Sequence, residues 1–294
     1  MRLSVIILSA LLLSPAAAQP SLPAAIWADP APDATHPAAM AEARIESHGA
    51  AMNAVVYTPS GAGPHPALLL LHGFPGNEQN LDLAQAARRQ GWVVLTFHYR
   101  GSWGSEGDFS FSHVVEDAKA AHDWLTAPEQ QARFNIDPAR TVVAGHSMGG
   151  FAATLTAAAR PKIAGLLLLD AWNPGLGAKT MKAGTPEAEV AGFFTGNIAP
   201  LSGTSGAALA REFLANKDRF DLTSYAAALA PRPVLSLAAT RGLAPENKAL
   251  TAAFQSASAA TLTAHEWPTD HSFSDARIRL ITTSLDWLRQ FEAR

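Results

Sequence analysis

Runs of apolar residues alternate with stretches of helical periodicity along most of the chain. The run 67–71, Ala-Leu-Leu-Leu-Leu, is continuously apolar, which is typical of a strand buried on both faces of a parallel sheet. Comparable runs occur at 92–97, 141–144, 163–169, 233–237 and 261–267. Segments with helical character separate them, at about 78–90, 112–125, 150–159, 245–256 and 274–291. This alternation predicts an α/β fold, with a mostly parallel central sheet and helices on both faces.

The remaining segments set the limits of the domain. Residues 19–42 are rich in proline and alanine and lack periodicity, which indicates an irregular lead-in. Two strands, 43–47 and 51–58, join around Gly49 and open a domain that we expect to span 43–294. The strand rhythm stops between 172 and 231, where short helical segments such as 207–215 predict a small cap insertion.

Three phenylalanines of the predicted cap have two possible roles. Phe193, Phe194 and Phe213 could line a substrate pocket or pack the cap against the core. Packing is the interpretation that we favour for most of them.

The first residues have the three parts of a secretory signal. Met1-Arg2 precede the apolar run 3–13, and Ser14-Pro15-Ala16-Ala17-Ala18 supplies small residues of the A-x-A type. We therefore expect cleavage after Ala18, a mature chain that begins at Gln19, and a periplasmic or secreted protein. The apolar run is too short to cross a bilayer comfortably, so no stable membrane anchor is expected.

Composition narrows the possible functions. The 294 residues are 48% hydrophobic and 16% charged, which suits one large domain with a sizeable core. The formal net charge is -3 and no basic cluster occurs, so we do not expect a nucleic acid partner. The chain has no cysteine, which excludes a disulfide, a thiol nucleophile and a thiolate metal site. No metal or organic cofactor is implied, and nothing in the sequence indicates an oligomeric state.

The main candidate for a catalytic motif is Gly145-His146-Ser147-Met148-Gly149. This G-x-S-x-G sequence stands between a predicted strand and a predicted helix, which is the context of a nucleophile elbow. A match of five residues alone is common in a chain with 21 glycines, but a match at a strand-to-helix junction is much rarer. We therefore interpret Ser147 as a nucleophile.

A serine hydroxyl needs a base, and the attack needs a site for the developing oxyanion. His271 lies in a loop between the last strand and the last helix, on the same edge of the sheet as Ser147, and is the obvious base. The backbone N–H groups of Met148 and Phe74 are the expected oxyanion donors, since each follows the end of a parallel strand.

These motifs together resemble the α/β-hydrolase superfamily, most closely its dienelactone-hydrolase-like and prolyl-oligopeptidase-like branches. The likeness runs from Ala51 to the C-terminus, and five segments carry it: 72–74, 99–107, 136–140, 145–150 and 270–273. The resemblance implies an α/β-hydrolase fold and the chain order serine, acid, histidine. It also implies the same roles for Ser147, His271, Phe74 and Met148.

The acid departs from the pattern of these branches, in which an aspartate follows the penultimate strand before a proline. Here that segment is Thr240-Arg241-Gly242-Leu243-Ala244-Pro245, with Gly242 at the expected place. Asp170 directly follows a buried strand and is the favoured substitute. Glu246 is the second candidate. It stands at an expected helix start, where a carboxylate more often complements the helix dipole than orients an imidazole. A serine–histidine dyad and a site without activity also remain open.

The sequence therefore predicts a serine hydrolase that cleaves carboxylic esters through an acyl-enzyme. Dienelactone hydrolase uses cysteine, so Ser147 points to general esters, thioesters or amides. A serine peptidase or amidase of the same fold is one alternative, and a non-catalytic binding protein of this fold is another.

Overall fold

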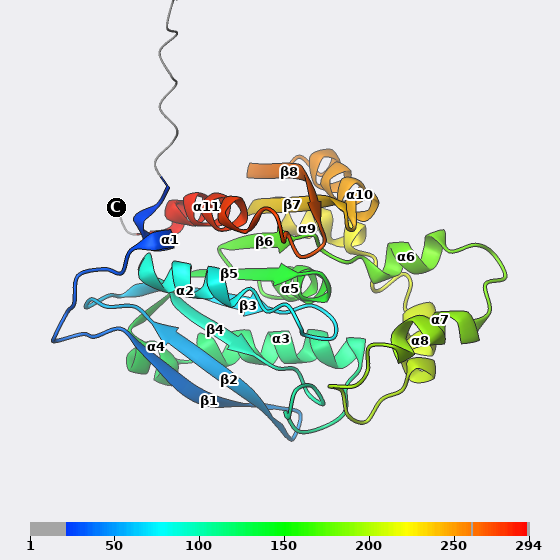
Figure 1. The fold of residues 1–294 in the computed structure, drawn as a ribbon, viewed down its shortest axis with the longest axis horizontal. Coiled ribbons are helices and arrows are strands. Elements are labelled where there is room, and N and C mark those ends of the chain that lie inside the picture. Colours follow the sequence, from blue (N-terminus) through cyan, green and yellow to red (C-terminus); the bar gives the residue numbers. More distant parts are fainter. Residues whose placement is uncertain (1–21, 260, 293–294) are drawn as a thin grey trace, which may run out of the picture.

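One eight-stranded sheet forms the centre of the part of the chain that the computed structural model describes, residues 22–259 and 261–292 (Figure 1). The strands are β1 (Ala39–Ser47), β2 (Ala50–Thr58), β3 (His65–Leu71), β4 (Val93–Phe97), β5 (Ile136–His146), β6 (Gly165–Leu169), β7 (Pro233–Arg241) and β8 (Thr261–Asp270). Their order is β1-β2-β4-β3-β5-β6-β7-β8. The pairs β1–β2 and β2–β4 are antiparallel and all others are parallel, as the apolar runs predicted.

Helices cover both faces of the sheet because the side chains of each strand alternate between two apolar layers. In β3, Ala67, Leu69 and Leu71 pack in the layer of α3 (Phe111–Leu125), α5 (Met148–Ala159) and α10 (Ala244–Ser256). Leu68 and Leu70 pack in the opposite layer, with α2 (Leu81–Arg89) and α11 (Arg277–Leu288). The short α1 (Ala24–Trp27) joins that second layer through Ala25 and Ile26.

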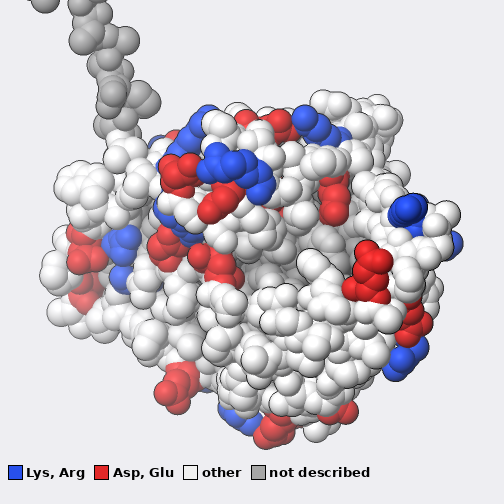
Figure 2. Space-filling model, turned by 45° about the vertical axis from the view of Figure 1, so that its right-hand side comes forward, with Lys and Arg blue, Asp and Glu red and all other residues white. Residues whose placement is uncertain are grey.

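The segment between β6 and β7 carries short helices, and the first three of them extend beyond one end of the sheet (Figure 1). They are α6 (Pro174–Thr180), α7 (Glu187–Thr195), α8 (Gly206–Ala215), η1 (Leu222–Tyr225) and α9 (Ala226–Leu229). Phe194 and Phe213 are buried here and join the core, whereas Phe193 is 69% exposed. Figure 2 brings this end forward and shows charged side chains of both signs interspersed among uncharged surface.

Several boundaries differ from those expected from sequence. β1 begins at Ala39, inside the predicted lead-in, because this outer strand pairs with β2 over its whole length. β5 begins at Ile136, ahead of the apolar run 141–144 that predicted it, with a register shift where Ile136 pairs with His65. The helix α4 (Pro128–Phe134) was not predicted. β8 continues to Asp270, into the segment expected to be a loop.

The cleavage position expected after Ala18 lies outside the described residues. Within those residues, no helix has both the length and the apolar character needed to cross a membrane.

Candidate active site

Ser147 stands on the tight turn between β5 and α5. Its backbone has φ 56° and ψ −120°, a conformation that costs a non-glycine residue on the order of 1–3 kcal/mol. Two neighbours hold it there: its N–H donates to the carbonyl of Leu169 at 3.0 Å, and its carbonyl accepts from the N–H of Trp172 at 3.0 Å. The strain is thus maintained by bonds to the end of the adjacent strand β6 and the loop after it.

The shortest hydrogen bond of the site joins His271 to Asp170. His271 Nδ1 lies 2.6 Å from Asp170 Oδ2, so the imidazole donates from Nδ1 and keeps Nε2 free to accept a proton. Asp170 itself follows β6 with φ 42° and is completely buried. No hydrogen bond joins the Ser147 hydroxyl to the imidazole within the described structure. Such contacts often close only when substrate binds.

Three further donors fix the Asp170 carboxylate. The backbone N–H of Leu243 donates to Oδ2 at 2.9 Å, and the N–H of Ala239 donates to Oδ1 at 3.0 Å. The side chain of Asn247 donates to Oδ1 at 3.2 Å. Each carboxylate oxygen therefore accepts two hydrogen bonds, which hold the carboxylate in place as it orients His271.

Gly242 explains how a carboxylate from β6 can reach this place. A Cβ atom on Gly242 would lie 2.1 Å from Asp170 Oδ2 and 3.1 Å from the Cα of His271. Any side chain at 242 would therefore displace the carboxylate. The glycine that departs from the family pattern leaves the space that Asp170 fills.

Glu246, the second acid candidate, does not contact His271 Nδ1. Its Oε2 instead accepts from the backbone N–H of Asn173 at 2.7 Å. Burial, reinforced by the nearby charge of Asp170, raises the pKa of Glu246 to about 7 in spite of that hydrogen bond. Glu246 is thus a neighbour of the site that changes charge near neutral pH.

The expected oxyanion donors flank Ser147. Met148 is the first residue of α5, so its N–H has no acceptor within the helix. The loop with Phe74 passes on the other side, where a Cβ on Gly73 would lie 3.0 Å from the Cβ of Ser147. Both N–H groups therefore belong to segments that adjoin the nucleophile, as an oxyanion site requires.

Sequence reasoning missed three residues around the site: His146, Trp172 and Asn247. His146 was treated only as a neighbour of Ser147, yet its Nε2 lies 2.8 Å from the carbonyl oxygen of His271. Asn247 lies in a helix 77 positions from Asp170, and no local pattern distinguishes it. Trp172 directly follows the Asp170-Ala171 step, so its position beyond a strand end was the one available signal.

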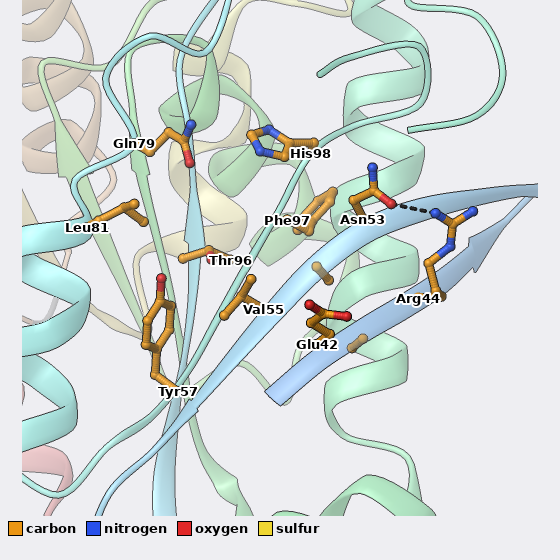
Figure 3. A pocket seen from close by; sticks show the side chains of 12 residues that line it. Glu42, Arg44, Asn53, Val55, Tyr57, Gln79, Leu81, Thr96, Phe97 and His98 are labelled. Carbon is orange, nitrogen blue, oxygen red and sulfur yellow. Dashed lines mark hydrogen bonds between the residues drawn. The ribbon is translucent and has the colours of Figure 1, made fainter. Parts of the chain in front are cut away.

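A large cavity lies away from these residues. It has a volume of about 690 Å³ and follows the face of β1, β2 and β4, where Tyr57, Thr96 and His98 line it (Figure 3). Arg44 at its edge is bonded to Asn53 (Figure 3). None of its lining residues belongs to the serine, histidine and aspartate group, so size alone does not locate the site.

The chain belongs to the alpha/beta hydrolase family, whose profile matches residues 68–291. The structure of EstE1, a thermostable carboxylesterase from a metagenomic library, superposes with a TM-score of 0.62 at 20% identity. That superposition covers 88% of this chain and 91% of EstE1 and shows a shared fold. The family match and the shared fold therefore agree on the architecture of the chain.

Curated relatives match over shorter stretches. An uncharacterised protein of Mycobacterium tuberculosis is 36% identical over 109 residues, which are 37% of this chain and 36% of that protein. The lysophosphatidylserine lipase ABHD12 of Danio rerio is 32% identical over 107 residues, or 35% of this chain and 26% of that protein. The chain thus matches only 26–36% of the length of these relatives. The dienelactone-hydrolase-like or prolyl-oligopeptidase-like branch stays a prediction.

Proposed function

We propose that this hydrolase cleaves carboxylic esters through an acyl-enzyme formed on Ser147. The observation that carries the proposal is the hydrogen bond between His271 Nδ1 and Asp170 Oδ2 at 2.6 Å, beside a serine held in an elbow. This bond fixes the tautomer in which His271 Nε2 can accept the serine proton.

The reaction then follows from these groups. His271 takes the hydroxyl proton while Ser147 Oγ attacks the ester carbonyl, and the N–H groups of Met148 and Phe74 stabilise the oxyanion. The alcohol leaves with the proton from His271. A water molecule, activated by the same imidazole, attacks the acyl-enzyme, and the acid is released as Ser147 regains its proton.

Two alternatives share the fold. A peptidase or amidase would use the same groups, but no propeller domain or acidic pair for a peptide amino terminus is recognisable in the sequence given. A non-catalytic binding protein would need neither a strained Ser147 nor a carboxylate with four donors. These features support an enzyme, and the resemblance to carboxylesterase structures supports esters.

Rapid mixing with p-nitrophenyl acetate tests the proposal. We expect a burst of p-nitrophenol close to one equivalent of enzyme, and an acetyl group on Ser147 after acid quenching. Ser147→Ala should abolish the burst and lower turnover by at least about a thousandfold. Turnover of p-nitroanilides at a comparable rate would favour the amidase, and full activity in Ser147→Ala would refute the nucleophile.

A further inference from the structure

The cap forms an apolar pocket that begins at the residue bonded to the nucleophile. The backbone N–H of Trp172 donates to the carbonyl of Ser147. Trp172 also lines a cavity of about 330 Å³. We call this cavity the cap pocket. Its apolar lining consists of Trp172, Met181, Val190, Phe193, Phe194 and Phe213. The volume falls at the lower end of the range of about 300–1,000 Å³ that small-molecule sites occupy.

Aromatic contacts connect the cap pocket to the oxyanion side of the site. The ring of Phe74 meets that of Phe194 edge to face at 6.0 Å. The ring of Trp172 stacks on that of Phe213 at 5.9 Å, with an interplanar angle of 7°. These contacts place the aromatic lining of the cap pocket next to Phe74, one of the two expected oxyanion donors.

Phe193 packs edge to face on Phe194, with ring centroids 5.3 Å apart, yet most of its surface remains in water. Its side chain is 69% exposed at the mouth of the pocket, although a phenylalanine in water gains nothing for folding. Small-molecule sites are lined predominantly by hydrophobic and aromatic side chains, so an exposed ring beside an apolar cavity is available to a ligand. Glu189, also in the lining, is the one ionisable side chain there.

We propose that the cap pocket binds an extended apolar group of the ester, which makes longer-chain or aryl esters the substrate class. This inference rests on the proposed ester hydrolysis. The group could belong to the acyl part or to the alcohol part, and both present the same hydrocarbon surface.

Paired substrates test this assignment. We expect kcat/KM for p-nitrophenyl octanoate to exceed that for the acetate by at least about tenfold. Comparing octyl acetate with ethyl acetate shows whether the alcohol part benefits instead. Phe193→Ser should lower the octanoate-to-acetate ratio at least fivefold. The control Ile278→Ser, an exposed apolar residue of α11, should leave the ratio unchanged.

The outcomes separate the two proposals. If no ester is hydrolysed, the proposed function fails. If esters are hydrolysed with no preference for longer groups, or if Phe193→Ser leaves the ratio unchanged, the cap pocket assignment fails. A preference for a choline ester over its uncharged 3,3-dimethylbutyl analogue would also overturn it, and would assign recognition to the carboxylate of Glu189.

His146 lies beside His271, the base of the proposed reaction. Its ring is buried, with its centroid 4.6 Å from that of His271. Because a carbonyl oxygen can only accept, the Nε2 that lies 2.8 Å from the His271 carbonyl carries the proton. Burial and the neighbouring His271 lower the pKa of His146 to about 4, so this ring is neutral at neutral pH.

The other ring nitrogen faces the oxyanion loop. His146 Nδ1 is buried and has no hydrogen-bond partner among the described residues. A Cβ on Gly73 would lie 3.3 Å from it. An unsatisfied acceptor destabilises a folded protein, so a phenylalanine ring would fill this space at lower cost. What the imidazole supplies, and a phenylalanine ring would not, is the hydrogen bond from Nε2 to the carbonyl of His271.

We propose that His146 is a positioning residue, which holds the backbone of His271 at a fixed place relative to Ser147 and the oxyanion loop. His146→Phe keeps the ring and removes the donor, whereas His146→Gln keeps a donor at the place of Nε2. We expect His146→Phe to lower kcat between tenfold and a hundredfold, with KM within twofold and an unchanged or higher melting temperature. His146→Gln should recover kcat to within about fivefold of the wild type.

Fluorophosphonate inactivation adds a second readout, since its rate depends on the same alignment without substrate turnover. It should slow in His146→Phe by the same factor as kcat. Wild-type kcat in a folded His146→Phe protein would overturn the proposal. So would equal losses in the phenylalanine and glutamine variants.

Discussion

A Cβ atom on Gly242 would lie 2.1 Å from the Oδ2 of Asp170, so the two residues compete for one position beside His271. In the branches that this chain resembles, the acid comes from the segment that holds Gly242. Here the carboxylate comes from the end of β6 instead, and its hydrogen bond to His271 Nδ1 is made across the space that the glycine leaves open. The space beside His271 therefore holds one carboxylate, and a side chain at 242 would enter the same space.

This relationship predicts that the acid can be moved. Asp170→Gly should lower kcat by three to four orders of magnitude, because His271 loses the group that orients it. Gly242→Asp alone should lower kcat at least about a hundredfold, because its new side chain displaces Asp170. The double variant Asp170→Gly/Gly242→Asp should exceed Asp170→Gly by at least tenfold. A folded double variant no faster than Asp170→Gly would show that the positions are not interchangeable.

A second prediction separates the two acid candidates. Asp170→Asn should retain the fold and lower kcat by roughly three to four orders of magnitude, because the amide favours the wrong imidazole tautomer. Glu246→Gln should change kcat less than about tenfold, because its bonding partner is Asn173 and not His271. Steady-state kinetics of both variants decides the assignment. A large loss in Glu246→Gln with none in Asp170→Asn would transfer the role, and no loss in either would indicate a dyad.

The raised pKa of Glu246 predicts a dependence of stability on pH. The pKa of Glu246 has its ordinary value of 4.5 in the unfolded chain and is about 7 in the folded protein. Between these values the native state binds more protons, so this group lowers the free energy of unfolding as the pH rises from 4.5 through 7. Glu246→Gln should remove that loss and stabilise the protein at pH 8 by about 3 kcal/mol, with no gain at pH 4.

Denaturant unfolding at the two pH values measures this difference, and the exposed Glu42→Gln is the matched control. An equal effect of Glu246→Gln at pH 4 and pH 8 would contradict the assigned titration.

Much of the fold could be predicted because short segments of the sequence indicate their own secondary structure. The continuous apolar runs at β3 and β6 show strands covered on both faces, and the structure confirms the mostly parallel sheet. Ser147 and His271 could be proposed because each follows a strand end in a recognisable motif. The predicted strand 43–47 is shorter than β1 because the exposed first residues of β1 do not show a clear alternation of apolar and polar positions.

The supporting contacts of the site could not be predicted, because they join segments far apart in the chain. His146 contacts the backbone of His271 across 125 positions, and Asn247 reaches Asp170 across 77. Neither residue has a local signature. Gly242 was noticed as a departure from a pattern, but only the fold shows that its missing side chain makes room for Asp170.

Export is a prediction that rests on the first 18 residues alone. The charged start, the apolar run and the small residues before Gln19 lead us to propose cleavage after Ala18. Mass spectrometry of the protein from its native host should find a chain that begins at Gln19 in the periplasm or medium. Intact Met1 in the cytoplasmic fraction would contradict it.

The central claim is that Ser147 is a nucleophile activated by His271 and Asp170. A fluorophosphonate probe followed by peptide mapping tests it most directly, because the phosphonyl group stays on the attacking oxygen. We expect one adduct per chain, on the peptide that carries Ser147, with no labelling of Ser147→Ala and labelling slowed by about a thousandfold in Asp170→Asn. Labelling at another residue, or none in the folded wild-type protein, would contradict the claim.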